Sequence, residues 1–587
     1  MSTTHKGAKF LALLAGGSIA LAACSTGTDT PGTADPDDTT SESSPAAGGE
    51  EEVTTKDQII PVAHEQEFNA YNNNTATDNA VKNTIVLNQV LTGFYEFGED
   101  GSVVPNEEFG TYEKTSDDPL TVEYKINPDA VWSDGEPIDC DDVMLNWASY
   151  SGAYDTGEGD TATLLFEPAS TTGTELMEKP ECADGDKDFT VVYTDTYSDW
   201  IAGIEEFLPA HIAEQEAGVE DIIAAVKDDD VEALGKVAEF WNTGWRFNPG
   251  ELNQDIIPSS GPYKIDSWEA GQSITLTANE EYWGTPPISS TIVVRIIGQE
   301  EQAQALQNGD VLVAEPQPNP DILAQMEALG DQVTVVQGDE FTFEHLDFNF
   351  TGAFADKALR EAFALCVPRD QIVENLITPV NANAEIAQSR LVMGFQPAYE
   401  EVASAIQDGK YDTADIAAAK ALVDGANAAG TEVRIGYQTP NPRRTNEVDL
   451  IRASCEQAGF KIVDHGQEDF FEAGLSGGNF DVALYAWSGS PLVSGSSSIY
   501  STTGGQNAGK YSNPEVDALF AELDVTPDLD EQTELIKQIE TILWDDLATI
   551  PLFNFPGLVA YDNTVSGVTF QPSQSSVTWN IQDWDLQ

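Results

Sequence analysis

The sequence has 587 residues and a formal net charge of −75, from 26 basic and 101 acidic residues. Nucleic acids and anionic lipids both attract basic surfaces, so this charge argues against either kind of binding. We interpret the charge as a solubility trait, with attraction of cationic ligands as the alternative. The chain is too long for one ordinary core, so two or three lobes are expected.

The N-terminus has the pattern of an export signal. A basic stretch that includes Lys6 and Lys9 precedes 14 uncharged residues, from Phe10 to Ala23. A membrane-spanning helix needs roughly 20 apolar residues, so this shorter run is typical of a signal peptide. The segment Leu21-Ala22-Ala23-Cys24 resembles a bacterial lipobox, in which the cysteine is lipidated and becomes the new N-terminus. The alternative is an ordinary signal peptide cleaved near a chance cysteine.

The segment after Cys24 is predicted to be a disordered tether. Residues 25–52 consist of Ser, Thr, Gly, Pro, Ala and acidic residues, which cannot bury enough apolar surface to offset chain entropy. We therefore expect a signal peptide at 1–23, and a lipidated Cys24 with its tether at 24–56. One lipid would anchor the protein to the cell membrane, on the extracytoplasmic face, without spanning it.

The body shows alternating helix and strand patterns. Residues 356–367 predict a helix that Asp356 caps, with Leu359, Phe363 and Cys366 on one face. A strand–helix–strand passage follows at 431–438, 443–460 and 461–467, with Gly459 as the helix stop. Residues 479–489 read as a further, buried strand. This alternation predicts an α/β fold.

Four cysteines remain in the body, and their even number in an exported chain suggests two disulfides. Three pairings are possible, and buried free thiols are the alternative. The four residues are Cys140, Cys182, Cys366 and Cys455.

No catalytic or metal-binding motif is complete. The G-x-S-x-G match at 474–478 precedes a strand instead of following one. The phosphate-loop-like segment 504–510 is followed by Tyr511, where such a loop needs Ser or Thr. The segment HEQEF at His64 lacks the second His of a zinc protease, and 184–188 lacks the spaced Glu of a calcium loop. The sequence therefore predicts no enzyme, no metal and no cofactor.

Several segments, in order, resemble one protein family. They are VWSDGEPIDCDDV (131–143), SGPYKIDSWEAGQSITLTANEEYWG (260–284), ALQNGDVLVAEPQ (305–317), LDFNF with FADKALREAFALCVPRDQIVE (346–374), YSNPEVDALFAEL (511–523) and DDLATIPLFNF (545–555). This ordered set is similar to the extracellular solute-binding proteins of ABC importers, in the peptide-binding family of oligopeptide, dipeptide and nickel binders. The resemblance runs from about Ile59 to the C-terminus.

The resemblance implies a two-lobed periplasmic-binding-protein-like fold (type II, the large three-domain peptide-binding class) with a hinge between the lobes. Lobe I would comprise 57–104, 246–342 and 551–587, with a domain inserted at 105–245, and lobe II would comprise 343–550. Two strands would cross between the lobes near 341–350 and 550–555. This partition favours the disulfides Cys140–Cys182 and Cys366–Cys455, because crossing pairs would oppose the hinge.

The resemblance also implies a mechanism and partners. A solute, most simply a peptide, binds in the interlobe cleft, hinge closure buries it, and a membrane permease reads the closed form. No bond is made or broken, and the protein is expected to act as a monomer. The alternative is a cell-envelope regulatory lipoprotein of the same fold that binds a lipid-linked glycan or a partner protein.

The ligand site departs from the family pattern. Peptide binders of the family carry an Asp shortly after a late-strand Trp, where it pairs with the α-amino group of the peptide. Here Trp487 is followed by Ser488, Gly489 and Ser490, and no acid appears before Ser501. Another acid must supply the charge, or the ligand has no free amine. The other candidate cleft residues, by position, are Glu315, Gln317, Tyr437 and Gln438.

Overall fold

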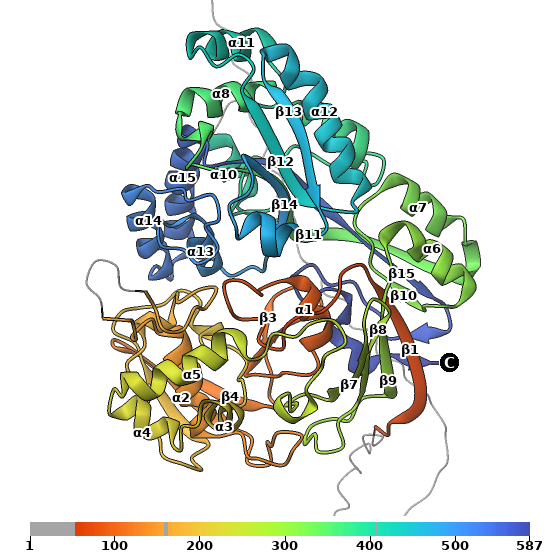
Figure 1. Cartoon of the computed structure of the whole chain (residues 1–587). Coiled ribbons are helices and arrows are strands. Elements are labelled where there is room, and N and C mark those ends of the chain that lie inside the picture. The colour runs from red at the N-terminus through yellow and green to blue at the C-terminus, as the bar shows by residue number, and fades with distance from the viewer. Residues whose placement is uncertain (1–52, 158–162, 407–408) are drawn as a thin grey trace, which may run out of the picture. The chain divides into compact units, whose positions relative to one another are not determined.

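The computed structural model describes residues 53–157, 163–406 and 409–587, and one ten-stranded mixed sheet runs through it (Figure 1). The strand order is β13-β12-β14-β11-β15-β10-β1-β9-β8-β7. The bounds are β1 (Lys56–His64), β7 (Tyr263–Glu269), β8 (Ser273–Ala278), β9 (Ser289–Ile296), β10 (Val313–Ala314), β11 (Val333–Phe348), β12 (Glu432–Gln438), β13 (Lys461–Gln467), β14 (Val482–Ser488) and β15 (Thr549–Asp562).

The two long strands β11 and β15 are shared by two lobes, which lie one above the other in Figure 1. They are 16 and 14 residues long and pair antiparallel with each other. On the first-lobe side β15 also pairs with β10, and on the second-lobe side β11 also pairs with β14. Both strands pass through the segments expected to cross between the lobes. They extend further than the sequence indicated, because each pairs with the other on both sides of a register shift between Asp339 and Phe343.

The first lobe is built on β1 and β7–β10. Its core contains Ile60, Val62, Ile292 and Val294. Two short antiparallel pairs complete its sheets, β2 (Tyr95–Phe97) with β3 (Val103–Pro105), and β16 (Val565–Ser566) with β17 (Asp585–Leu586). Its helices are α1 (Val81–Leu87), α6 (Gln299–Asn308) and α7 (Pro320–Glu327).

An additional subdomain lies on the first lobe, at the lower left of Figure 1. Its three-stranded sheet consists of β4 (Gly110–Asp117), β5 (Leu120–Ile126) and β6 (Asp188–Val192). The rings of Tyr124 and Phe189 stack between β5 and β6 with centroids 5.0 Å apart. Its helices are α2 (Cys140–Tyr150), α3 (Ala210–Ala217), α4 (Ile222–Lys227) and α5 (Val231–Thr243).

The second lobe packs helices around β12–β14. The predicted helix 356–367 is α8 (Lys357–Cys366), and the Asp356 side chain accepts a hydrogen bond from the Ala358 N–H. The predicted strand–helix–strand passage is also confirmed as β12, α12 (Pro442–Ala458) and β13, with Gly459 in the left-handed region at φ 108°. The remaining helices are α9 (Arg369–Ile372), α10 (Tyr399–Ile406), α11 (Ile416–Gly425), α13 (Ser497–Tyr500), α14 (Pro514–Asp524) and α15 (Leu529–Asp546).

Two disulfides are present, with the expected pairing. Cys140–Cys182 lies within the subdomain, and Cys366–Cys455 joins α8 to α12 in the second lobe. Neither disulfide links the two lobes, so both leave relative motion of the lobes unhindered.

The N-terminal predictions fall mostly outside the described residues. The signal peptide, Cys24 and the tether up to residue 52 cannot be compared with the structure. The tether predicted for 24–56 ends earlier, because Lys56 already belongs to β1, where it pairs with Ser289. In the part of the chain that the structure describes, no helix has the length and apolar character to cross a membrane.

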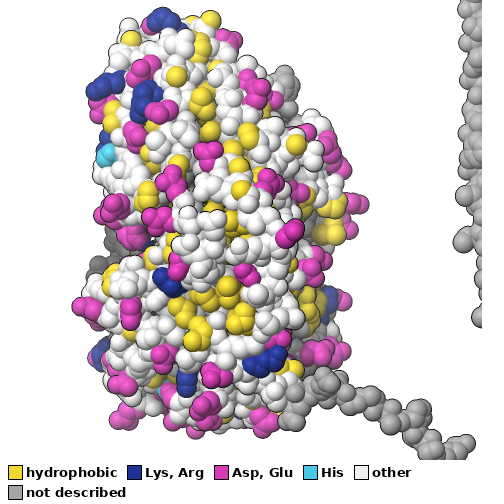
Figure 2. Space-filling model, turned by 90° about the vertical axis from the view of Figure 1, so that its right-hand side faces the viewer, with side chains coloured by type: hydrophobic (Ala, Val, Ile, Leu, Met, Phe, Trp, Pro, Cys, Tyr) yellow, Lys and Arg dark blue, Asp and Glu magenta, His cyan; other side chains and the backbone are white. Residues whose placement is uncertain are grey.

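The acidic side chains are dispersed over the face of the protein drawn in Figure 2. Figure 2 shows Asp and Glu side chains scattered over the whole visible face, with few Lys or Arg side chains among them. Scattered carboxylates remain solvated and keep a protein soluble. This face therefore fits the interpretation of the net charge as a solubility trait.

Candidate functional site

A cavity of about 1070 Å³ lies between the two lobes, beside the crossing strands. Ligand pockets for drug-sized molecules typically measure roughly 300–1,000 Å³, so this cavity has room for an extended ligand. Its walls come from the first lobe, the subdomain, the crossing strands and the second lobe, chiefly from within 64–106, 169–206, 315–318, 340–343, 390–396, 471–510 and 571–579.

A local irregularity in β11 turns side chains toward the cavity. The pairing of β11 with β15 shifts register between Asp339 and Phe343, and the intervening Glu340, Phe341 and Thr342 line the cavity. The Phe341 N–H donates to a carbonyl in the 571–579 segment, and the Phe341 carbonyl accepts from Gly489 N, at 2.9 Å. Bulges of this kind re-aim side chains. One of the two strands that connect the lobes therefore also carries residues that line the cavity.

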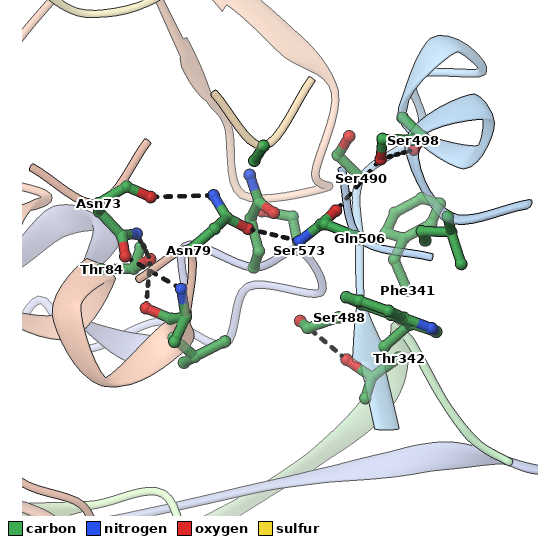
Figure 3. Close-up of a pocket in the computed structure, with 18 of the residues that line it drawn as sticks. Asn73, Asn79, Thr84, Phe341, Thr342, Ser488, Ser490, Ser498, Gln506 and Ser573 are labelled. Carbon is green, nitrogen blue, oxygen red and sulfur yellow. Dashed lines mark hydrogen bonds between the residues drawn. The ribbon is translucent and has the colours of Figure 1, made fainter. Parts of the chain in front are cut away.

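The two lobes touch across the cavity. Lys82 Nζ of the first lobe lies 2.6 Å from Glu472 Oε1 of the second lobe. The Gln506 side-chain amide donates to Asn79 Oδ1 at 3.3 Å, as Figure 3 shows. On the subdomain side, Tyr197 donates to Ser494 Oγ at 3.1 Å. The two lobes therefore meet at separate points around the cavity.

Uncharged polar side chains form much of the cavity wall. In Figure 3, Asn73, Asn79 and Thr84 of the first lobe face Ser490, Ser498 and Gln506 of the second. Below them, Thr342 of β11 donates to Ser488 Oγ at 3.0 Å, beside the ring of Phe341. Amides and hydroxyls of this kind hydrogen-bond main-chain groups or hydroxyls of a ligand.

Two carboxyl groups at the crossing strands act on each other. Glu315 follows β10, and Glu340 lies in the irregular part of β11. Burial, and then the charge of Glu340, raises the pKa of Glu315 to about 8, while burial raises the pKa of Glu340 to about 7. Glu315 accepts hydrogen bonds from the Ser576 hydroxyl and from Val577 N, the latter at 3.2 Å. A positive ligand group beside the pair would relieve this repulsion.

A second pair of carboxyl groups lies at the subdomain end of the cavity. Burial, and then its neighbour Glu206, raises the pKa of Glu205 to about 8, and burial also raises the pKa of Glu206. Glu205 accepts a hydrogen bond from the Tyr95 hydroxyl at 3.1 Å, and both glutamates and Tyr95 line the cavity.

The basic residues of the cavity wall do not balance these acids. Arg390 pairs with Glu540 at 2.6 Å, and Arg444 pairs with Glu344 at 2.6 Å, both inside the second lobe. Lys82 is paired with Glu472, so of the described cations in the wall Lys510 remains. The cavity wall therefore holds more carboxyl groups than unpaired cations. Among the described residues, no group of His, Cys, Asp and Glu is arranged to hold a metal ion.

The family follows from sequence comparison. The family model of bacterial extracellular solute-binding proteins, family 5 Middle, matches residues 104–510. The chain belongs to this family. Family 5 proteins are the solute-binding components of ABC importers, a class of binding proteins and not of enzymes.

Relatives and a solved structure agree with this assignment. The chain is 30% identical over 538 residues to an uncharacterized lipoprotein of Mycobacterium tuberculosis, covering 88% of this chain and 91% of the relative. It is 26% identical over 504 residues to the oligopeptide-binding protein OppA of the same species, covering 82% and 77%. The fold matches that of the oligopeptide-binding protein AppA from Bacillus subtilis in complex with a nonapeptide, with a TM-score of 0.73, 18% identity and coverage of 91% and 99%.

Six residues singled out from the sequence line the cavity of this family 5 protein: Glu315, Gln317, Trp487, Ser488, Gly489 and Ser490. Within the described part of the chain, the buried Nε1 of Trp487 has no hydrogen-bond partner. The amide of Gln317 is used within the protein, because it donates to Glu65 at 2.6 Å and accepts from Asn441 at 2.9 Å. Gln317 thus ties the first lobe to the start of α12.

Tyr437 and Gln438 do not line the cavity. Tyr437 is buried in the second-lobe core, and its hydroxyl lies 3.0 Å from Thr445 Oγ1 of α12. Gln438 donates a hydrogen bond to the Glu468 carbonyl beyond β13. At the end of β12, the side chain of Tyr437 therefore turns to α12 and that of Gln438 to the segment after β13.

The glutamates Glu340, Glu205 and Glu206 were missed in the sequence. Glu205 and Glu206 are adjacent acids between apolar residues, in AGIEEFLPA (202–210), and Glu340 directly precedes the alternating Phe341 and Phe343 in EFTFEHLDF (340–348). Acids in apolar surroundings are candidates for buried functional groups, so the signal was present. No local pattern in the sequence indicates that these segments meet at one cavity.

Proposed function

We propose that this protein is the peptide receptor of an ABC importer, anchored to the extracytoplasmic face of the cell membrane by a lipid on Cys24. It captures a peptide between its lobes and, as a monomer, delivers it to the membrane permease. The interlobe cavity of about 1070 Å³ is the observation that carries this proposal. The similarity to OppA, and to AppA with its nonapeptide, supports a peptide, and the relative named as a lipoprotein supports the anchor.

Bending of β11 and β15 provides the hinge in this proposal. Lobe I takes 57–104, 246–342 and 551–587, the inserted domain takes 105–245, and lobe II takes 343–550. A ligand held by both lobes stabilises the closed arrangement, and the permease reads the resulting shift in population. Ligand contacts at Glu340, Phe341 and Thr342 would act directly on the connecting strands.

The pair Glu315 and Glu340 captures the α-amino group of the peptide in this account. The loop after Trp487 provides hydroxyls and no carboxylate, so the charge must come from the opposite wall. Two carboxyls that repel each other at the crossing strands bind an ammonium group well, because the cation compensates both. The serine and asparagine side chains of Figure 3 would then hydrogen-bond the main chain of the peptide.

Calorimetric titration with alanine pentapeptide and its N-acetylated form tests this function. We expect the free peptide to bind about ten- to hundred-fold more tightly, the value of a charge-assisted contact. Glu315→Gln and Glu340→Gln should weaken the free peptide and leave the acetylated peptide little changed. Asp339→Asn is the matched control, because Asp339 is the exposed neighbour of Glu340 and does not line the cavity.

Two outcomes would contradict the proposal in different ways. Failure of every peptide to bind the wild-type protein would reject peptide capture. Strong dependence on the free amine that survives both glutamine substitutions would reject the placement of the amine site.

A further inference from the structure

The subdomain end of the cavity contains two adjacent glutamates and two tyrosines that are not part of the proposed amine site at Glu315 and Glu340. Glu205 and Glu206 lie between α3 and the short turn Trp200–Ala202. Tyr95 donates to Glu205, and Tyr150, the last residue of α2, also lines the cavity. We refer to Tyr95, Tyr150, Glu205 and Glu206 as the subdomain corner.

The hydroxyl of Tyr150 is the observation that points to a ligand. Tyr150 is only 8% exposed, and its buried hydroxyl oxygen has no hydrogen-bond partner among the residues that the structure describes. Tyr150, Glu205 and Glu206 all line the same cavity, and burial, followed by the charges of the two glutamates, raises the pKa of Tyr150 well above its usual value. A buried hydroxyl without a partner costs free energy, which a ligand group placed between it and the carboxyls would recover.

The carboxyl groups of the subdomain corner indicate that the ligand group bound there carries a positive charge. Among the described residues, no lysine or arginine forms an ion pair with Glu205 or Glu206. Of the cations in the described cavity wall, Lys82, Arg390 and Arg444 form ion pairs with other glutamates, which leaves Lys510. Two adjacent carboxyls flanked by phenol rings favour a cation, through charge and through the negative faces of the rings.

We propose that the subdomain corner binds a basic side chain of the peptide, the ammonium of lysine or the guanidinium of arginine. This inference rests on the proposed peptide function. It makes the receptor selective for peptides with two positive groups, one at the α-amino end and one along the chain. The two acid pairs come from different segments that line the same cavity, so one extended ligand meets both.

Titration with matched pentapeptides tests the inference. Five alanine pentapeptides carry one lysine each, at successive positions, and five counterparts carry the uncharged norleucine instead. We expect the best lysine peptide to bind about ten- to hundred-fold more tightly than its norleucine counterpart. Glu205→Gln with Glu206→Gln should abolish this difference, and Glu239→Gln, an exposed acid of α5, should retain it.

Tyr150→Phe provides a second variant for this test in case the Glu205→Gln, Glu206→Gln double variant misfolds. It removes only a hydroxyl that has no protein partner, so the fold should be unaffected and the preference for lysine should fall. A lysine preference that persists in both the double variant and Tyr150→Phe would overturn the inference.

Cadaverine, a free diamine, separates failure of this inference from failure of the proposed function. If alanine pentapeptide binds and lysine adds nothing, the inference is wrong and the peptide function stands. If no peptide binds but cadaverine binds to the wild type and not to the double variant, the cation site stands and the peptide function is wrong. If neither binds, both are wrong.

Discussion

At the scale of single residues, the pKa values of Glu315 and Glu340 predict how binding depends on pH. With pKa values of about 8 and about 7, both carboxyls are mostly protonated at pH 6 and become charged as the pH rises. The groups facing them are Ser576, Val577 N and Thr342, and none is cationic. Affinity for a free-amine peptide should therefore rise from pH 6 to about 8. Above that it should fall, because an α-amino group has a pKa of roughly 7.7–8.0.

Titration calorimetry in two buffers of different ionisation enthalpy measures this effect. The free peptide should release protons on binding near pH 7, because the ammonium favours the charged carboxyls. The acetylated peptide is the control and should show a flat profile. A free peptide whose affinity is constant from pH 6 to 8 would show that neither glutamate contacts the amine.

The pair Arg390 and Glu540 is predicted to stabilise the second lobe. Both side chains are fully buried, and Glu540 also accepts from Ser389 Oγ at 2.7 Å and from Leu391 N at 3.1 Å. Removing one member of a buried pair leaves an uncompensated charge, which costs about 3–5 kcal/mol. Glu540→Ala should therefore lower the free energy of unfolding by about that amount.

Urea unfolding with a control on the same helix checks this value. Glu534 of α15 forms an exposed pair with Lys537 at 2.8 Å, and such pairs contribute roughly 0–1 kcal/mol. Glu534→Ala should therefore change stability little. Equal losses for Glu540→Ala and Glu534→Ala would mean that the buried pair adds nothing.

At the scale of elements, the sequence predicted those whose signals are local. Helix α8 has its cap at Asp356, and α12 has its apolar spacing and Gly459 within a few residues. The full length of β11 could not be predicted, because it depends on pairing with β15. That strand lies about 200 residues further along the chain, so no local pattern shows how far the pairing extends. For the same reason no local signal showed that Glu340 faces a cavity: the register shift that turns it depends on both strands.

The disulfide between α8 and α12 is predicted to affect stability and not binding. Cys366 and Cys455 are 89 residues apart, and a loop of this length contributes about 4–5 kcal/mol in the chain-entropy model. Replacing both with Ala should lower second-lobe stability by about 2–5 kcal/mol. Affinity for alanine pentapeptide should be unchanged, because the bond lies within one lobe. A weakened affinity at unchanged stability would show that this disulfide shapes the cavity.

At the scale of the whole molecule, ligand binding and lobe movement depend on the same strands. The lobes are connected through β11 and β15, and the irregular part of β11 faces the cavity. The contacts between the lobes are polar and individually weak: Lys82 pairs with Glu472 at a partly exposed position, and Thr172, Tyr197 and Ser198 of the subdomain form hydrogen bonds with the second lobe. We therefore expect the protein without ligand to populate open arrangements, and a ligand held by both walls to select the closed one.

Pulsed electron spin resonance between the lobes tests this central claim most directly. Spin labels introduced as unnatural amino acids at Glu239 of α5 and Glu456 of α12 occupy exposed positions on the subdomain and the second lobe. Saturating free alanine pentapeptide should convert a broad distance distribution into one narrow distribution, and the acetylated peptide at the same concentration should not. A distribution that stays the same when calorimetry shows the peptide bound would contradict capture by closure of the interlobe cavity.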